Sequence, residues 1–222
     1  MNDHISQMLF FDKNVKRYQY KETIAMRESG ILMHITSLPA PYGIGTMGKD
    51  AYAFVDFLVR AGQRYWQILP LTPTGYGDSP YQSLGACAGN HYLIDLDRLA
   101  DEGLLKKEEI QNIPWGSNPA RVDFGAMYAH RMNVLRLAFQ RFTPDGAYET
   151  FVEQNRNWLE DYALFTALKD TLGGKPWLDW PEALRLRKAD ALTEKRRELS
   201  DEIRLQYFVQ YEFDRQWKAL RS

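Results

Sequence analysis

The sequence contains almost no cysteine. Its 222 residues include a single one, Cys87, which excludes an intrachain disulfide and a metal site built from several cysteines. His4, His91 and His130 stand far apart in the chain, and this spacing does not indicate a metal site. The composition fits a reducing compartment, so we expect a cytoplasmic protein with no bound metal.

Long hydrophobic runs are missing as well. No run of 18 or more apolar residues occurs, so the sequence predicts no helix that spans a membrane. Residues 1–20 mix charged side chains with a short apolar patch from Met8 to Phe11, and they lack the apolar core of a secretory signal. We therefore expect no membrane partner.

An excess of charge of either sign is also absent. Lys and Arg number 28 against 29 for Asp and Glu, and a formal net charge of -1 gives no attraction to a nucleic acid or an anionic membrane. A neutral ligand such as a sugar suits this balance. Aromatic residues make up 14% of the chain and would stack on sugar rings, although composition alone favours rings that fill a core.

The first part of the chain predicts a βαβ unit. Residues 30–38 form a nearly continuous apolar run, which is typical of a strand buried on both faces. Residues 48–61 place apolar side chains on one helical face before Gly62, and residues 65–71 form a second apolar run. A strand, a helix and a strand in this order predict two parallel strands joined by a right-handed crossover.

After residue 71 the pattern changes. Residues 72–91 form a long loop, residues 92–96 fit either a short strand or the lead-in to a helix, and the chain is helical from Asp123 onward. The expected helices begin near Asp123, cover residues 158–172 and run from Leu192 to the C-terminus. In the first of them we expect an apolar face made of Tyr128, Met132, Leu135 and Phe139. Two parallel strands cannot form a complete sheet, so we expect a fragment of a larger α/β fold.

One glycine motif raises an alternative function. Gly43, Gly45 and Gly48 match the G-x-G-x-x-G pattern that binds dinucleotides between a strand and a helix. The first glycine stands too far from the preceding strand, however, and residues 64–71 contain no acidic residue for a ribose. A flexible loop is the favoured interpretation, and a nucleotide-dependent α/β enzyme stays as an alternative.

Two isolated residues have structural interpretations that compete with functional ones. His34 lies in the first predicted strand and has the chemistry of a catalytic group or a ligand, but a satisfied, buried histidine is more common. Cys87 has no base near it in the sequence, so we interpret it as a small apolar filler.

The loop that follows the second predicted strand is the strongest functional candidate. In parallel α/β folds, ligands bind on the loops at the C-terminal ends of strands. Gly75 and Gly77 allow backbone conformations that are closed to other residues, and Pro80 fixes the conformation of its neighbour. It holds aromatic, hydroxyl, amide and carboxylate groups in a pattern that favours sugar recognition over an ordinary surface turn; these are Tyr76, Asp78, Ser79, Tyr81 and Gln82.

Several stretches together resemble the 4-α-glucanotransferases of the amylomaltase, or disproportionating enzyme, family. They are Ser-Gly-Ile-Leu-Met-His-Ile-Thr-Ser-Leu-Pro (29–39), Tyr-Gly-Ile-Gly (42–45), Ala-Gly-Gln-Arg-Tyr-Trp-Gln-Ile-Leu-Pro-Leu (61–71), the loop 76–82, and Ala-Gly-Asn with Tyr-Leu-Ile (88–94). The resemblance is specific over residues 27–105. It is weaker from there to Ser222, and residues 1–26 show none.

The resemblance implies a (β/α)8 TIM barrel, of which this chain is the N-terminal part. Residues 1–26 would be an N-terminal extension, 27–105 the first strands and helices with the substrate loop 72–91, and 106–222 a helical insertion. The implied reaction transfers α-1,4-glucan segments between maltooligosaccharides by a retaining double displacement and needs no cofactor. The nucleophile, the acid/base and a third carboxylate are expected C-terminal to Ser222, in the missing part of the barrel, so this chain holds no catalytic residue.

The resemblance also assigns roles within the loop. Tyr81 matches a tyrosine that stacks on the glucose whose bond is cut, and Asp78 and Ser79 match its neighbours in the same pocket. Tyr76 matches a tyrosine with glucan contacts away from the cleavage point, and Gln82 completes the predicted substrate-binding set. Departures from the family pattern occur at His91, where many relatives carry proline, and at Ile35 and Cys87. A glucan-binding fragment without catalytic activity is the main alternative function.

Overall fold

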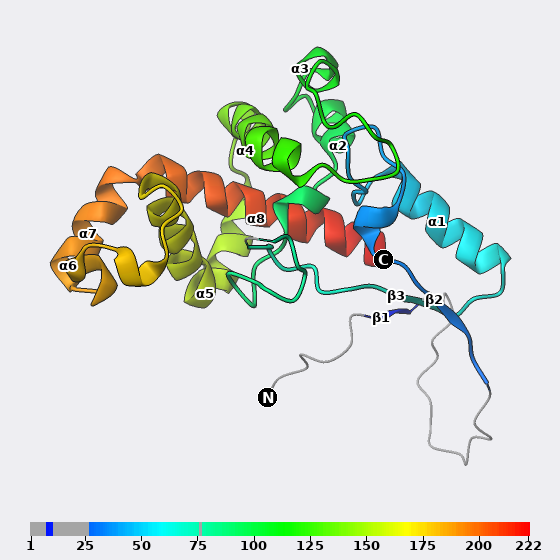
Figure 1. Cartoon of the computed structure of the whole chain (residues 1–222), viewed down its shortest axis with the longest axis horizontal. Helices are drawn as coiled ribbons and strands as arrows, with labels where there is room; N and C mark the ends of the chain where they lie inside the picture. The colour runs from blue at the N-terminus through cyan, green and yellow to red at the C-terminus, as the bar shows by residue number, and fades with distance from the viewer. Residues whose placement is uncertain (1–7, 11–26, 76) are drawn as a thin grey trace.

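The computed structural model describes residues 8–10, 27–75 and 77–222. Within these residues, three short strands form one sheet in the order β1–β3–β2: β1 (Met8–Phe10), β2 (Gly30–Leu32) and β3 (Tyr65–Gln67). β2 is parallel to β3, with Ile31 opposite Trp66, and β1 is antiparallel to β3. Helix α1 (Lys49–Arg60) connects β2 to β3, which confirms the predicted βαβ unit (Figure 1).

The strands are shorter and less covered than predicted. After Leu32 the chain turns into a short 3-10 helix, Ile35–Ser37, in which the Ser37 amide donates to the His34 carbonyl. All three residues of β2 are exposed, whereas Trp66 in the central strand β3 is fully buried. The prediction that the first strand is buried on both faces is wrong for this chain, because β2 lies at the edge of the sheet.

Helix α1 has the predicted bounds and face. It begins after Gly48 and ends at Arg60, and Gly62 then adopts a φ of 68°, which few residues with a side chain tolerate. Ala51 and Leu58 are fully buried on the face toward the sheet. The apolar periodicity therefore identified both the extent of the helix and the side that packs.

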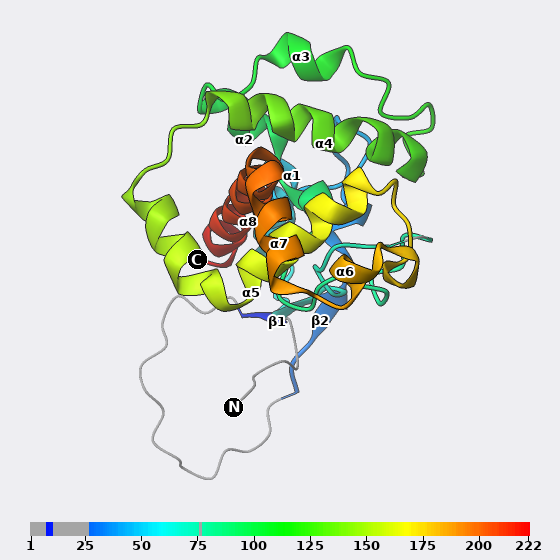
Figure 2. The same ribbon diagram turned by 90° about the vertical axis from the view of Figure 1, so that its left-hand side faces the viewer.

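The rest of the chain is helical. Its helices are α2 (Leu96–Asp101), α3 (Lys107–Gln111), α4 (Phe124–Arg141), α5 (Gly146–Thr171), α6 (Glu182–Arg185), α7 (Ala189–Glu198) and α8 (Ser200–Arg221). Figures 1 and 2 show α8 as the central helix, with α4 along one side and α5 along the other. The Asp123 carboxylate accepts a hydrogen bond from the Ala126 amide at 3.0 Å, as expected for the N-cap of α4. Gly173 and Gly174 follow the end of α5, as predicted.

Of the two interpretations of residues 92–96, the helix lead-in is confirmed, with a 3-10 turn at His91–Leu93. Three other expectations for the helical part are corrected. The helix predicted over residues 158–172 begins earlier, at Gly146. The last predicted helix is two helices, because the chain bends at Leu199 between α7 and α8. In α4 the buried face is rotated from the predicted one, and Tyr128 is 83% exposed. Apolar residues surround much of α4, so its sequence pattern did not select the packing face.

Two of the buried clusters meet along α8. The first lies among α2, α4 and α8 and includes Leu99, Leu135 and Phe208. The second joins Trp66 of β3 to Leu220 near the end of α8. Because α8 contributes to both, the helical part and the sheet share one scaffold. None of the helices among the described residues is both long and apolar enough to cross a membrane.

Candidate functional site

The loop 72–91 leaves the C-terminal end of β3 and folds back on itself as a tight hairpin. Thr74 and Ser83 form an isolated antiparallel bridge, and the Gly75 amide donates to the Gln82 carbonyl at 3.1 Å. At the tip, Gly77 and Asp78 adopt positive φ values of 91° and 56°. Glycine takes this conformation freely and aspartate is one of the few other residues that tolerate it, so the sequence allows the turn.

The hairpin brings together four of the five predicted site residues. Tyr81 is 72% exposed and Gln82 is exposed, whereas Asp78 and Ser79 are half-buried beneath them. The Ser79 hydroxyl accepts a hydrogen bond from the Tyr81 amide at 3.3 Å, and burial raises the pKa of the Asp78 carboxyl. Tyr76, the fifth, lies outside the described residues. The tip thus presents an aromatic ring beside hydroxyl, amide and carboxyl groups.

A pocket of about 240 Å³ lies behind the loop, between residues 86–89 and helices α5 and α8. Trp158 and Trp217 supply aromatic walls, and Asn155 and Asp214 supply polar groups. Cys87 lines the pocket and is exposed, so its interpretation as a buried filler is wrong. Among the described residues, no group of three or more His, Cys, Asp or Glu is arranged to hold a metal ion.

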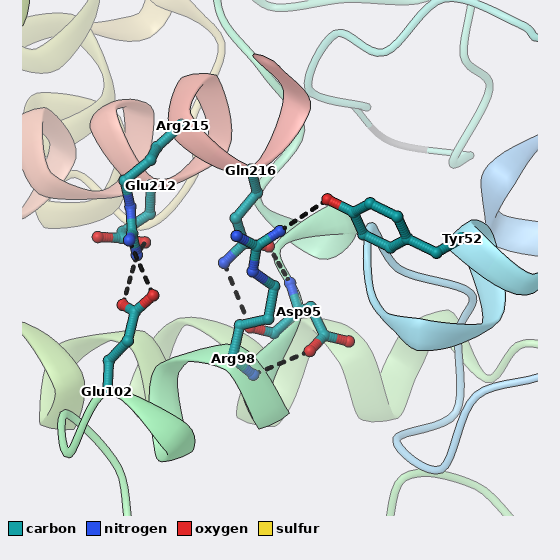
Figure 3. A network of polar contacts seen from close by, with 7 residues as sticks. All are labelled: Tyr52, Asp95, Arg98, Glu102, Glu212, Arg215 and Gln216. Carbon is teal, nitrogen blue, oxygen red and sulfur yellow. Dashed lines mark hydrogen bonds and ion pairs between the residues drawn. The ribbon is translucent and has the colours of Figure 1, made fainter. Parts of the chain in front are cut away.

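Two buried glutamines of α8 bind backbone groups in this part of the chain, Gln210 at the end of the loop and Gln216 at the start of α2, and sequence reasoning did not identify them. The side-chain oxygen of Gln210 accepts from the Gly89 amide at 2.7 Å, and its nitrogen donates to the Gly89 carbonyl at 3.0 Å. Gln216 makes the same pair of bonds to the backbone of Asp95, at 2.7 and 3.4 Å (Figure 3). The available signal was the recurrence of glutamine, at 206, 210 and 216, on a helix that also carries many apolar side chains.

Further polar contacts fix α2 against α8 and α1. The Asp95 carboxylate caps α2 by accepting from the Arg98 amide at 2.9 Å, and the Arg98 side chain donates to the Tyr52 hydroxyl at 3.1 Å (Figure 3). Arg215 of α8 donates to both Glu102, at the end of α2, and the buried carboxylate of Glu212. These hydrogen bonds raise the pKa of Arg215, while burial raises the pKa of Glu212.

The glycine motif is packed inside the protein. A Cβ atom at Gly43 would stand 2.4 Å from the Trp115 carbonyl oxygen, and one at Gly48 would stand 2.0 Å from the Asp95 carboxylate. That carboxylate occupies the start of α1, where a phosphate would have to approach. The expectation of a flexible loop is wrong, since this stretch is buried, and its contacts favour packing over a dinucleotide site.

Two histidines are held neutral: His34, shortly after β2, and His91, at the end of the loop 72–91. Burial lowers the pKa of His34 to about 4, and burial together with the charge of Arg131 lowers the pKa of His91 to about 3. His34 is half-buried, and its Nδ1 atom has no hydrogen-bond partner in the described part of the chain. We predicted a buried histidine whose ring nitrogens are hydrogen-bonded. The prediction is wrong for Nδ1, which has no partner among the described residues.

Arg131 is a buried cation that the sequence did not reveal. It lies on α4, is fully buried, and donates to the backbone carbonyls of Tyr92, at 3.0 Å, and Ile94. Its guanidinium also lies 5.8 Å from the centre of the Trp115 ring. Arg131 thereby satisfies the backbone of the 3-10 turn that follows the loop.

Comparison with known proteins connects this arrangement to one family. The sequence model described as 4-alpha-glucanotransferase matches residues 33–222. The 4-alpha-glucanotransferase of Thermus thermophilus is 49% identical over 202 residues, covering 88% of this chain and 39% of that protein. The enzyme of the same name from Streptococcus pneumoniae serotype 4 is 46% identical over 200 residues, covering 88% and 40%.

Solved structures agree with the sequence matches. The amylomaltase of Streptococcus agalactiae, solved in complex with acarbose, superposes with a TM-score of 0.84 at 45% identity, over 88% of this chain and 40% of that one. The amylomaltase of Corynebacterium glutamicum, at 17% identity and a TM-score of 0.65 over 87% of this chain and 28% of that one, shares the fold. The chain spans about two fifths of the length of these two curated relatives. With a family match over residues 33–222, this chain belongs to the 4-α-glucanotransferase family.

Proposed function

We propose that the complete protein containing this chain is a 4-α-glucanotransferase. It transfers α-1,4-glucan segments between maltooligosaccharides by a retaining double displacement that requires no cofactor. The observation that carries this proposal is the exposed Tyr81 ring on a rigid hairpin at the C-terminal end of a parallel strand, within a chain that belongs to this family. The acarbose complex of the Streptococcus agalactiae amylomaltase supports a glucan-like ligand.

In this proposal the chain is the first part of a (β/α)8 barrel. Residues 27–105 contribute the first strands and helices, residues 106–222 form a helical insertion, and residues 1–26 form an extension. The parallel β2–α1–β3 unit followed by helices α2 to α8 supports this division. The barrel's remaining strands carry the nucleophile, the acid/base and the third carboxylate, beyond Ser222. A cytoplasmic location completes the proposal.

The loop residues then act as a substrate platform. The Tyr81 ring stacks on the glucose whose bond is cut, and its 72% exposed side chain leaves a face open for that contact. Ser79 and Gln82 offer uncharged groups that hydrogen-bond sugar hydroxyls, and Asp78 adds a carboxyl group. Tyr76 keeps its predicted role, which is to contact glucose units of the glucan away from the bond that is cut.

Replacing Tyr81 in the complete enzyme tests this assignment. We expect Tyr81→Ala to lower kcat/KM for disproportionation of maltotriose by about tenfold or more, because the ring that orients the donor is lost. Tyr81→Phe keeps the ring and should stay close to the original enzyme. Phe57→Ala, which removes a half-exposed ring from α1, outside the loop, is the control.

Three outcomes would contradict the proposal. An unchanged kcat/KM in Tyr81→Ala would remove Tyr81 from the donor site. Failure of the complete enzyme to convert maltotriose into glucose and longer maltodextrins would overturn the activity itself. The 222-residue chain alone should catalyse no transfer, and glucose released from maltotriose by that chain would show that the catalytic carboxylates lie within it.

A further inference from the structure

The loop 72–91 has an exposed tip and two stems, of which the first follows β3 and the second is residues 85–90. Residues 81–84 are exposed, so little of the described chain covers the tip. The first stem continues directly from β3, and the two stems meet where the Asn90 amide donates to the Leu71 carbonyl at 2.7 Å. The second stem packs against helices α5 and α8.

Two glycines allow this stem to approach those helices closely. A Cβ atom at Gly85 would stand 2.9 Å from the ring of Tyr162 on α5, and one at Gly89 would stand 2.0 Å from the ring of Phe213 on α8. A residue with a side chain cannot occupy the second position without moving the stem or the ring. The stem therefore rests on α5 and α8 at these two points.

The Gln210 side chain completes the attachment at Gly89. It is 2% exposed, and its amide group accepts from and donates to the backbone of the same residue, at 2.7 and 3.0 Å. The Gln210 amide thus pairs with both the N–H and the C=O of Gly89, as the backbone of a neighbouring strand does in a sheet. The segment 88–90 is buried, so without Gln210 both polar groups of Gly89 would lose the partner that the protein supplies.

We propose that Gln210 is a positioning residue for glucan transfer: it fixes the second stem of the loop on α8 and so places the Tyr81 ring for the donor sugar. Gln210 touches no substrate in this role and acts through Gly89. The proposal rests on the proposed function, because it takes Tyr81 as the donor platform. It makes α8, far along the sequence, part of the machinery that shapes the substrate loop.

The chain contains a matched control in Gln216. This residue is also on α8, is fully buried, and makes the same two bonds to the backbone of Asp95. Asp95 caps the start of α2 and lies beyond the loop. Gln210→Leu and Gln216→Leu thus remove the same kind of clamp from the same helix, and only the first releases the loop.

The experiment compares these two variants in the complete enzyme. We expect Gln210→Leu to lower kcat/KM for maltotriose on the order of 10- to 100-fold through misplacement of the donor, and Gln216→Leu to change it less than about twofold at a similar loss in Tm. Hydrogen–deuterium exchange without substrate should show faster exchange at residues 77–86 in Gln210→Leu only.

A third variant gives a readout that a purely structural role would not produce. Gln210→Glu keeps the shape of the side chain, and its protonated carboxyl both donates and accepts as the amide does, whereas its carboxylate only accepts. Its kcat/KM relative to the original enzyme should therefore recover as the pH is lowered. The corresponding ratio for Gln216→Glu should show no such recovery.

The outcomes separate this inference from the proposed function. Equal losses of kcat/KM in the two leucine variants, or unchanged exchange at residues 77–86 in Gln210→Leu, would overturn the positioning role. Faster exchange with unchanged kcat/KM would show that Gln210 attaches the loop but would overturn its positioning role in transfer. The Tyr81→Ala variant tests the donor assignment separately, so the two failures can be told apart.

Discussion

The two parts of this chain differ in how far each buries its own apolar surface. The strand-and-loop region, residues 27–90, leaves Leu32 of β2 59% exposed and Phe57 of α1 52% exposed. The helical region, residues 91–222, packs α4 and α5 against opposite sides of α8, and Phe208 at its centre is fully buried (Figure 2). A parallel sheet is normally covered on both faces, and the described residues cover this one only in part.

The loop 72–91 belongs to one region by sequence and is held by the other. Its stem rests on α5 and α8 through Gly85 and Gly89. The end of α8 in turn reaches the core beneath the sheet through Leu220. The helical region is thus a scaffold for the loop as well as a folding unit.

The sharpest test of this comparison is the removal of one ring from each region of the 222-residue chain. Phe208 contacts Phe139 and Phe142 at ring-centre distances of 5.8 and 4.9 Å, so Phe208→Ala should lower the free energy of unfolding by about 3–5 kcal/mol. Phe57→Ala should lower it by less than about 1 kcal/mol, because the ring is half-exposed. Urea unfolding measures both, and equal losses would contradict the difference between the regions.

A second test asks whether the strand-and-loop region is completed by the rest of the barrel. In the 222-residue chain, Leu32→Ala should cost less than about 1 kcal/mol, because the side chain is largely exposed. In the complete protein the same change should cost about 2–4 kcal/mol, because a neighbouring barrel strand would bury it. If the cost is small in both, β2 is not covered as the barrel proposal requires.

The smallest expected effect is a difference in acid sensitivity between the regions. The pKa of His91 is lowered to about 3 and that of His34 to about 4, against about 6.5 in an unfolded chain. Between these values the unfolded chain binds a proton that the folded chain does not, so stability is lost as the pH falls from about 6.5. His91→Gln and His34→Gln should flatten the fall in Tm between pH 7 and pH 4 by similar amounts, and only His91→Gln should flatten it further below pH 4. Curves parallel to the original would contradict the cause.

Local sequence signals predicted local structure well. Asp123 caps α4, Gly62 and Gly173 follow helix ends, and the apolar spacing of residues 48–61 gave the extent and buried side of α1. Each of these depends on backbone conformation or periodicity within a few residues. The long loop over residues 72–91 was predicted for the same reason, whereas its hairpin, closed by the bridge between Thr74 and Ser83, was not.

Features that depend on distant contacts were missed or predicted incorrectly. The face of α4 that packs, with Tyr128 left exposed, was set by α8 and not by the apolar pattern of α4. The break at Leu199 and the burial of Arg131 depend on how the helices cross. A residue's own neighbours in the sequence carry no information about such partners.

The sequence by itself determined the family, the βαβ unit and the composition of the loop around Tyr81, because motif residues and periodicity are properties of the chain alone. Only the tertiary structure decided what holds that loop. Gln210 and Gly89 are 121 residues apart, and their hydrogen bonds exist because α8 packs beside the loop. A buried backbone N–H or C=O group can form a hydrogen bond with any suitable group that reaches it. Which group reaches it depends on the packing of the whole fold.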